Sequence, residues 1–235
     1  WDLPLDQDGD SLTLTVADST GASDSDTVVI TVLPNPAPVI TSSNSANGTY
    51  GAPFTYTIIA TNSPTTYGET NLPAGLTLSG AVISGTPTEA GFFSVTLSAQ
   101  NTGGTGSKTL SLNIAKANAT VVVTPYSVTY DGNPHSATVT ITGVLGETGA
   151  AVGTVNLSPP HINAGVYSDS WSFNGGTKYN NIASTPITNT INKANATVTV
   201  NGYTGTYDGA AHGATGSAAG VGGVNLSGGL TLGAT

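Results

Sequence analysis

Residues 91–115 read GFFSVTLSAQNTGGTGSKTLSLNIA, and their pattern of apolar residues is the clearest indication of the fold. Apolar residues fill alternate positions in two runs, at Val95, Leu97 and Ala99 and at Leu110, Leu112 and Ile114. Alternation with a period of two is typical of a strand that buries one face. Gly and Asn in the polar segment between the runs are typical of a turn. The stretch therefore predicts strands of a sheet and not a helix.

Runs of the same kind recur along the whole chain. They lie at 12–16, 28–32, 139–141 and 198–200, and clusters of Gly, Pro and Asn separate them. No segment of useful length has a helical period. Many short strands with turn residues between them favour β-sandwiches. The sequence therefore predicts an all-β protein of tandem immunoglobulin-like β-sandwich modules in series.

The composition excludes several kinds of partner. Charged residues make up 7% of the 235 residues, and 13 acids face four bases, all of them lysine. Without arginine the chain cannot make bidentate phosphate contacts, so nucleic acid and anionic membrane surfaces are poor partners. No apolar run approaches the ~20 residues of a membrane span. The chain has no Met, so Trp1 is not a translation start and we expect a piece of a longer or processed protein.

An internal repeat organises the second half of the chain. The matching segments are 116–120 and 193–197 (KANAT), 130–132 and 207–209 (YDG), and 155–158 and 224–227 (VNLS). The first two pairs share an offset of 77 residues and the third has an offset of 69, so the first copy has eight extra residues, expected around 143–151. We interpret these segments as two copies of one module, of which the second stops about halfway.

The repeat and a Pro-dense joint at 33–38 (LPNPAP) predict the domain boundaries. The expected segments are 1–33, the C-terminal part of an Ig- or cadherin-like module; 36–115, a complete β-sandwich; 116–192, a second complete sandwich; and 193–235, the N-terminal part of a second copy of that repeat. A half sandwich leaves backbone groups unpaired. We expect a longer chain to complete the halves, or else neighbouring subunits to complete them head to tail in a fibre.

Residues 36–115 carry motifs of a known family. They are GAPFTY at 51–56, ATNSP at 60–64, LPAGL at 72–76, ISGTP at 83–87 and AQN at 99–101. The segment resembles the putative-Ig repeats of bacterial surface proteins, relatives of the cadherin-like domain of dystroglycan. In LPAGL we expect a turn pinned by Leu72 and Leu76, and in ISGTP a bend where Gly85 permits a close approach.

The flanking segments resemble related families. Residues 116–192 and 193–235 are similar to the mostly bacterial Ig-like repeats, on the YDG turn at 130–132, the following His135, and WSFNGG at 171–176. DQDGD at 6–10, ADSTGA at 17–22 and a Val-rich last strand mark the first segment. On these residues, 1–33 resembles the tail of a polycystic-kidney-disease-type or cadherin-like domain. These resemblances imply an extracellular or cell-surface location and roles in spacing and adhesion.

Asp6, Asp8 and Asp10 form the best candidate metal site. Alternate carboxylates ahead of a strand can point to one side and meet the oxygen-only demand of Ca²⁺. Further possible ligands are Asp18, Asp24 and Asp26. The alternative is an acidic turn in contact with water. The spacing does not fit an EF-hand, because position 12 counted from Asp6 is Ala17.

No catalytic constellation is evident, and we expect no enzyme activity. There is no Gly-x-Ser-x-Gly elbow, and the acids of the two complete modules are too sparse to predict the paired carboxylates of a glycosidase. His135, His161 and His212 form no short-spaced ligand pair, and Cys is absent. His135 and His212 occupy equivalent repeat positions, which predicts a structural hydrogen bond beside the YDG turn.

The leading functional hypothesis is a structural or adhesive spacer, whose partners are further Ig-like modules of the same chain or of neighbouring subunits. The alternatives are a module that binds a surface glycan or a protein partner, and an accessory region of a secreted hydrolase. Trp171 and Phe173 share a strand face, near Tyr167 and Tyr179, and could stack on sugar or pack in a core. A buried Trp171 would favour the spacer.

Overall fold

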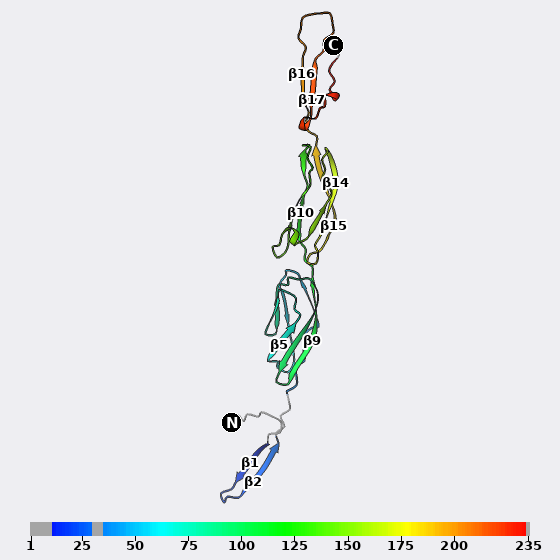
Figure 1. Ribbon diagram of the computed structural model, residues 1–235. Helices are drawn as coiled ribbons and strands as arrows, with labels where there is room; N and C mark the ends of the chain where they lie inside the picture. Colours follow the sequence, from blue (N-terminus) through cyan, green and yellow to red (C-terminus); the bar gives the residue numbers. More distant parts are fainter. Residues whose placement is uncertain (1–10, 30–34, 234–235) are drawn as a thin grey trace. The chain divides into compact units, whose positions relative to one another are not determined.

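The structure is a computed structural model that describes residues 11–29 and 35–233. The chain divides into two compact units, Trp1–Ala115 and Lys116–Thr235. Among the described residues every regular element is a β-strand, apart from the short 3-10 helices η1 (Gly149–Ala151), η2 (Val221–Gly223) and η3 (Ser227–Gly229). The all-β prediction is confirmed (Figure 1). In the described part of the chain no helix is long and apolar enough to cross a membrane.

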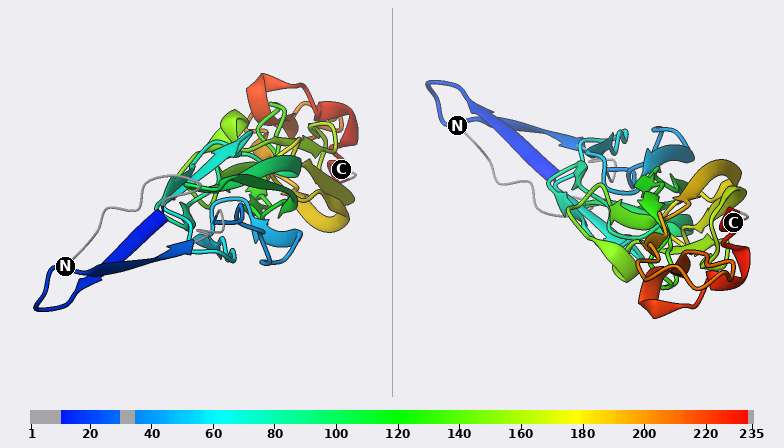
Figure 2. Two further views of the ribbon diagram at one scale, coloured as in Figure 1. Left: turned by 90° about the horizontal axis from the view of Figure 1, so that it is seen from below. Right: turned by 90° about the horizontal axis from the view of Figure 1, so that it is seen from above.

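The first unit begins with an antiparallel hairpin, which Figure 2 shows in blue. It consists of β1 (Ser11–Ala17) and β2 (Ser23–Val29). β1 falls where the alternating apolar pattern at 12–16 predicted a strand. β2 begins at Ser23, ahead of the predicted run at 28–32, and overlaps it only at Val28 and Val29, because Ile30 and Val32 lie outside the described residues.

The rest of this unit is an immunoglobulin-like sandwich of two sheets. One sheet has the order β3-β9-β8-β5 and the other β4-β7-β6. Their strands are β3 (Ser45–Thr49), β4 (Phe54–Thr57), β5 (Thr66–Thr70), β6 (Leu76–Ser79), β7 (Val82–Gly85), β8 (Gly91–Asn101) and β9 (Gly104–Ala115). The alternating apolar residues of 91–115 form the core of this sandwich. Val95, Leu97 and Leu110 are fully buried, as is Ile83 of the second sheet.

The LPAGL motif at 72–76 and the ISGTP motif at 83–87 are in direct backbone contact at their glycines. Thr86 N–H donates to the Gly75 carbonyl at 3.0 Å, and Thr88 N–H donates to the Ala74 carbonyl at 2.9 Å. A Cβ on Gly85 would lie 2.2 Å from the Gly75 oxygen, so the close approach predicted for ISGTP is confirmed. The LPAGL turn differs in one respect, because Pro73 is fully buried with Leu76 whereas Leu72 is only half-buried. The buried residues of this turn are therefore Pro73 and Leu76, in place of the predicted Leu72 and Leu76.

The Pro-dense joint is tied to the sandwich by two asparagines of the family motifs. Asn101 is 6% exposed, and its Nδ2 donates to the carbonyls of Pro36 at 2.9 Å and Asn62 at 2.7 Å. The Asn62 Nδ2 donates to the Ala37 carbonyl at 2.8 Å. A Cβ on Gly103 would lie 1.6 Å from the Asn35 oxygen, so glycine is required where the joint crosses the β8–β9 turn. The start of the module is therefore held by specific hydrogen bonds.

The second unit contains another two-sheet arrangement, with a four-stranded sheet of order β11-β15-β14-β13 and a pair β10-β12. The strands are β10 (Thr120–Thr124), β11 (Ser127–Thr129), β12 (Thr138–Thr142), β13 (Thr154–Leu157), β14 (Gly165–Asn174) and β15 (Ile182–Asn192). Tyr179 is fully buried, and its hydroxyl donates to Glu147 Oε2 at 2.9 Å. Glu147 belongs to the extra residues of the first copy, which lie between β12 and β13 as predicted.

Residues 193–233 form a hairpin of β16 (Thr197–Asn201) and β17 (Thr215–Ala219). Thr197 lies opposite Ala219, just as Thr120 lies opposite Thr142 in β10–β12, so the two segments of repeated sequence have the same register. Val198 and Val200 are 52% and 55% exposed, although their counterparts in β10 are half-buried. Within residues 193–233 no second sheet accompanies the hairpin.

Candidate functional site

The predicted calcium ligands Asp6, Asp8 and Asp10 lie outside the described residues. Asp24 and Asp26, the possible further ligands, lie two residues apart on β2. Asp18 has another role, because its Oδ1 accepts hydrogen bonds from the Thr20 hydroxyl at 2.7 Å, Thr20 N–H at 2.8 Å and Ala22 N–H at 3.1 Å. The Thr20 hydroxyl, followed by the backbone N–H groups, lowers the pKa of Asp18. Asp18 therefore closes the β1–β2 turn. No cluster of three or more potential metal ligands occurs in the part of the chain that the structure describes.

The YDG turn carries the histidine contact that the repeat predicted. Nε2 of His135 lies 2.9 Å from Oδ1 of Asp131. Asn133 N–H donates to the same carboxylate oxygen at 2.9 Å. The pKa of Asp131 is lowered to about 2, mainly by this backbone hydrogen bond and next by the hydrogen bond with His135. The second copy repeats the contact, with His212 Nε2 at 2.8 Å from Asp208 Oδ1. The prediction of a structural hydrogen bond at these equivalent positions is confirmed.

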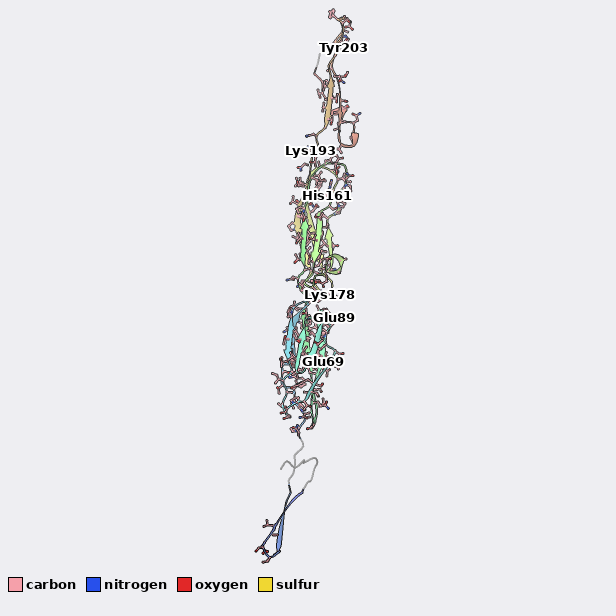
Figure 3. The ribbon with its side chains drawn as sticks, turned by 90° about the vertical axis from the view of Figure 1, so that its left-hand side faces the viewer. Glu69, Glu89, His161, Lys178, Lys193 and Tyr203 are labelled. Carbon is pink, nitrogen blue, oxygen red and sulfur yellow. The ribbon has the colours of Figure 1, made fainter. Side chains whose placement is uncertain are left out.

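A second His–Asp pair lies beside the first. His161 and His135 exchange backbone hydrogen bonds at 2.9 and 3.1 Å, which brings residues far apart in the sequence onto neighbouring chain segments. His161 Nε2 lies 3.0 Å from Asp169 Oδ1, and its ring stacks on Tyr167 with centroids 3.7 Å apart. Figure 3 labels His161 in this module. Sequence spacing alone could not reveal this pair, because the backbone bridge between the two histidines creates it.

Asn189 is the buried centre of this cluster. It is 3% exposed, and its Nδ2 donates to Asp169 Oδ2 at 2.7 Å while its Oδ1 accepts from Tyr126 N–H at 3.1 Å. The Asn189 bond is the main cause that lowers the pKa of Asp169, and His161 is the second. The Tyr126 hydroxyl, which lines a small hollow in this cluster, is buried without a hydrogen-bond partner among the described residues. The contacts of Asn189 fix β14 against β15 and the segment that precedes β11.

The cluster encloses too little space for a substrate. The hollow lined by Tyr126, His135, Asp169 and Asn189 has a volume of about 10 Å³. That volume corresponds to roughly one water molecule. Burial, followed by the charge of Asp169, raises the pKa of Tyr126. The geometry therefore favours a structural polar network over a catalytic His–Asp dyad.

The aromatic residues considered for sugar stacking serve mostly inside the module. Phe173 is 2% exposed and Tyr179 is fully buried. The Tyr167 hydroxyl donates to the Asn163 carbonyl at 2.6 Å, and the Tyr167 ring covers His161. Trp171 is half-buried on the same inward side of β14 as Phe173. Phe173 and Tyr179 therefore form no exposed platform, whereas the half-buried Trp171 does not meet the criterion of a buried ring that would favour the spacer.

Sequence reasoning missed one exposed aromatic residue, Phe92 on β8, which is 88% exposed. The signal was present in the Phe92–Phe93 pair. Val95, Leu97 and Ala99 point inward, so the period of two places Phe93 on the inner side and Phe92 on the outer side.

Comparison with known proteins identifies one segment. Residues 37–115 match the family model described as "Putative Ig domain". This part of the chain is therefore similar to the immunoglobulin-like domains of that family, in agreement with its motifs. The resemblances stated for residues 1–33, 116–192 and 193–235 stay predictions. No curated protein matches the chain.

Several solved structures are similar to parts of the chain. One is described as a "putative alpha-galactosidase/melibiase" from Bacteroides fragilis, with 26% identity and a TM-score of 0.33, covering 40% of this chain and 21% of that one. Another contains the N-terminal four Ig domains of Dscam1 isoform 9.44, with 12% identity and a TM-score of 0.39, covering 74% of this chain and 51% of that one. This chain thus spans about a fifth of the length of the galactosidase structure.

Proposed function

We propose that this chain is a structural and adhesive spacer within a bacterial extracellular protein, either anchored at the cell surface or secreted. Its sandwiches would hold a terminal unit away from the cell and would have no catalytic role. The immunoglobulin-like domain at residues 37–115 supports a scaffold of this kind. The contacts of the His–Asp cluster also support it, because they join strands and leave no substrate space.

The observation that carries the proposal is the pairing of early and late strands within each sandwich. In the first, β3 pairs in parallel with β9, and Tyr50 N–H donates to the Ala115 carbonyl at 2.9 Å. In the second, β11 pairs in parallel with β15, and Tyr130 N–H donates to the Asn192 carbonyl at 2.8 Å. A pull on the two ends of a module slides such strands along each other. Their hydrogen bonds are therefore loaded together instead of one at a time, which suits a load-bearing spacer.

Single-molecule force spectroscopy on the chain, held by its two ends, tests this role. We expect two strong unfolding events, each releasing about 25 nm, because ~80 residues extend to about 27 nm at ~3.4 Å per residue. The hairpin β16–β17 should open at lower force, since its antiparallel bonds separate one by one. Unfolding of both sandwiches at the force that opens the hairpin would contradict the load-bearing role.

The extracellular location needs a separate measurement. An antibody against residues 37–115 should label intact, unpermeabilised cells that produce the native protein. Labelling that appears only after the cells are permeabilised would place the protein inside the cell and overturn this part of the proposal.

A further inference from the structure

The outer face of the sheet β3-β9-β8-β5 contains a shallow hollow beside Phe92. Asn47, Asn113 and Phe92 form one row across β3, β9 and β8, since Asn113 lies opposite both of the others. The next row consists of Ser45, Ser111 and Ser94. The first row stands higher than the second because serine is the smallest of the three residue types. The hollow is lined by both rows together with Ala46, Phe93 and Leu112. Its volume is about 430 Å³, within the ~300–1,000 Å³ of small-molecule sites.

The solvent-exposed ring of Phe92 forms one wall of the hollow. Phe92 is 88% exposed, and a single exposed apolar side chain is ordinary on a protein surface. Here, however, the ring stands beside two amide side chains, and Asn113 Nδ2 lies 3.4 Å from Asn47 Oδ1. Amides offer both donors and acceptors, and serine hydroxyls do the same. The hollow thus combines one apolar wall with a floor and flank that can form hydrogen bonds.

The face around the hollow carries no charge, although the whole chain has a net charge of −9. The outward positions are 45, 47 and 49 on β3, 66, 68 and 70 on β5, the even positions 92–100 on β8, and the odd positions 105–113 on β9. All are Ser, Thr, Asn, Gln, Gly or Phe. Glu69 on β5 and Lys108 on β9 are charged, but both pair with Leu97 of β8. Because Leu97 faces the core, these two side chains lie on the inner side of the sheet and not on the outer face. A partner that complements this face is therefore uncharged and rich in hydrogen-bonding groups.

We propose that the hollow binds a neutral glycan, with one sugar ring stacked on Phe92 and its hydroxyl groups bonded to Asn47 and Asn113. The C–H groups on the apolar face of a sugar carry partial positive charge, and the face of an aromatic ring is negative. The hydroxyls at the sugar edge match the amides and the serine floor. This inference goes beyond the spacer function, and it holds whether or not the modules bear load.

A printed array of neutral oligosaccharides, with sialylated and sulfated glycans as charged comparators, tests the proposal with the 235-residue chain. We expect binding to one class of neutral glycan. Phe92→Ala should weaken that binding by about tenfold or more, as expected for the loss of one stacked ring. Phe92→Trp should retain it. Tyr207→Ala, which removes an aromatic side chain that is 96% exposed in the other unit, is the matched control and should leave it unchanged.

Three outcomes would overturn the proposal. They are binding to no neutral glycan, binding that Phe92→Ala leaves intact, and self-association that Phe92→Ala abolishes in sedimentation experiments. The last result would assign the face to a second copy of the chain. Because Phe92 is exposed, its variants should melt at the temperature of the parent protein, which separates a lost site from a lost fold.

Discussion

Gly75 and Gly85 illustrate how single residues shape the first sandwich. Both have positive φ, at 89° and 140°. A Cβ on Gly75 would lie 2.0 Å from the Thr86 carbonyl oxygen, and a Cβ on Gly85 would lie 2.2 Å from the Gly75 carbonyl oxygen. The LPAGL and ISGTP motifs therefore depend on each other. A resemblance identifies the motifs from the sequence, but the contact between them exists only in the folded domain.

Gly85→Ala should destabilise the first sandwich by about 2 kcal/mol or more, because it adds a clash to an unfavourable backbone conformation. Gly80→Ala is the matched control, since Gly80 also has positive φ but nothing within 4 Å of its Cβ position. It should cost about 1 kcal/mol. Hydrogen exchange of peptides from residues 72–88 measures both. Equal losses in the two variants would show that the close approach contributes nothing.

The Asp131 turn predicts a dependence on acid pH. The pKa of Asp131 is lowered from its ordinary value of 3.8 to about 2 in the folded protein. Its contribution to stability is therefore complete above pH 3.8 and is lost as the pH falls toward 2. A ¹³C NMR titration should give the low midpoint directly. In His135→Ala the midpoint should rise but stay below 3.8, because Asn133 N–H still donates to the carboxylate. An unchanged midpoint would exclude a contribution from His135.

At the scale of an element, the edge strand β3 shows how register determines the effect of a substitution. Ser111 N–H donates to the Asn44 carbonyl and Tyr50 N–H to the Ala115 carbonyl. In a parallel ladder these bonds imply that the N–H groups of even-numbered β3 residues face β9 and those of odd-numbered residues face away. Proline should therefore be tolerated at odd positions only.

Ala46→Pro should lower the stability of the first sandwich by about 2–3 kcal/mol and also its unfolding force, because a ladder donor is lost. Asn47→Pro should cost about 1 kcal/mol or less, since its N–H faces away from β9. Denaturant unfolding and force spectroscopy measure the pair. If both variants unfold at the force of the parent, the β3–β9 pairing does not carry the load.

The acidic segment ahead of β1 supports a second prediction about an element. Alternate carboxylates repel one another, and Ca²⁺ would neutralise that repulsion if Asp6, Asp8 and Asp10 bind it. Millimolar Ca²⁺ should then raise the melting temperature of the β1–β2 region above its value in a chelator. The triple variant with Asn at all three positions should melt at the same temperature in both. If calcium has no effect on the parent chain, the acidic turn in contact with water remains the explanation.

In the whole molecule, the two copies of the repeat differ in whether a second sheet packs with the first two strands. β10 and β16 share sequence and register, but the valines of β16 are exposed. Residues 127–129 form β11 against β15, whereas their counterparts 204–206 form no strand. Tyr203, labelled in Figure 3, stacks on His212 and is 50% exposed, while its counterpart Tyr126 is half-buried. The segment 193–233 thus shows the repeat without its second sheet.

Hydrogen exchange should therefore be faster in β16–β17 than in β10–β12, by about tenfold or more, because few buried contacts protect it. The difference should persist on dilution if further residues of a longer chain complete the module. Exchange in β16–β17 that slows as protein concentration rises would instead support completion by a neighbouring subunit in a fibre. Equal and concentration-independent protection would contradict the half-module interpretation.

The all-β class, the positions of several strands, the likeness of residues 37–115 to an immunoglobulin-like family and the hydrogen bond beside the YDG turn could all be predicted from the sequence. These follow from local properties, since a period of two defines both a strand and its buried side. Which of these sides are covered depends on the packing of strands against each other in the folded protein. Asn189 at the centre of the His–Asp cluster, the hollow beside Phe92 and the exposed valines of β16 all depend on contacts between strands distant in the sequence. Local periodicity does not encode those pairings.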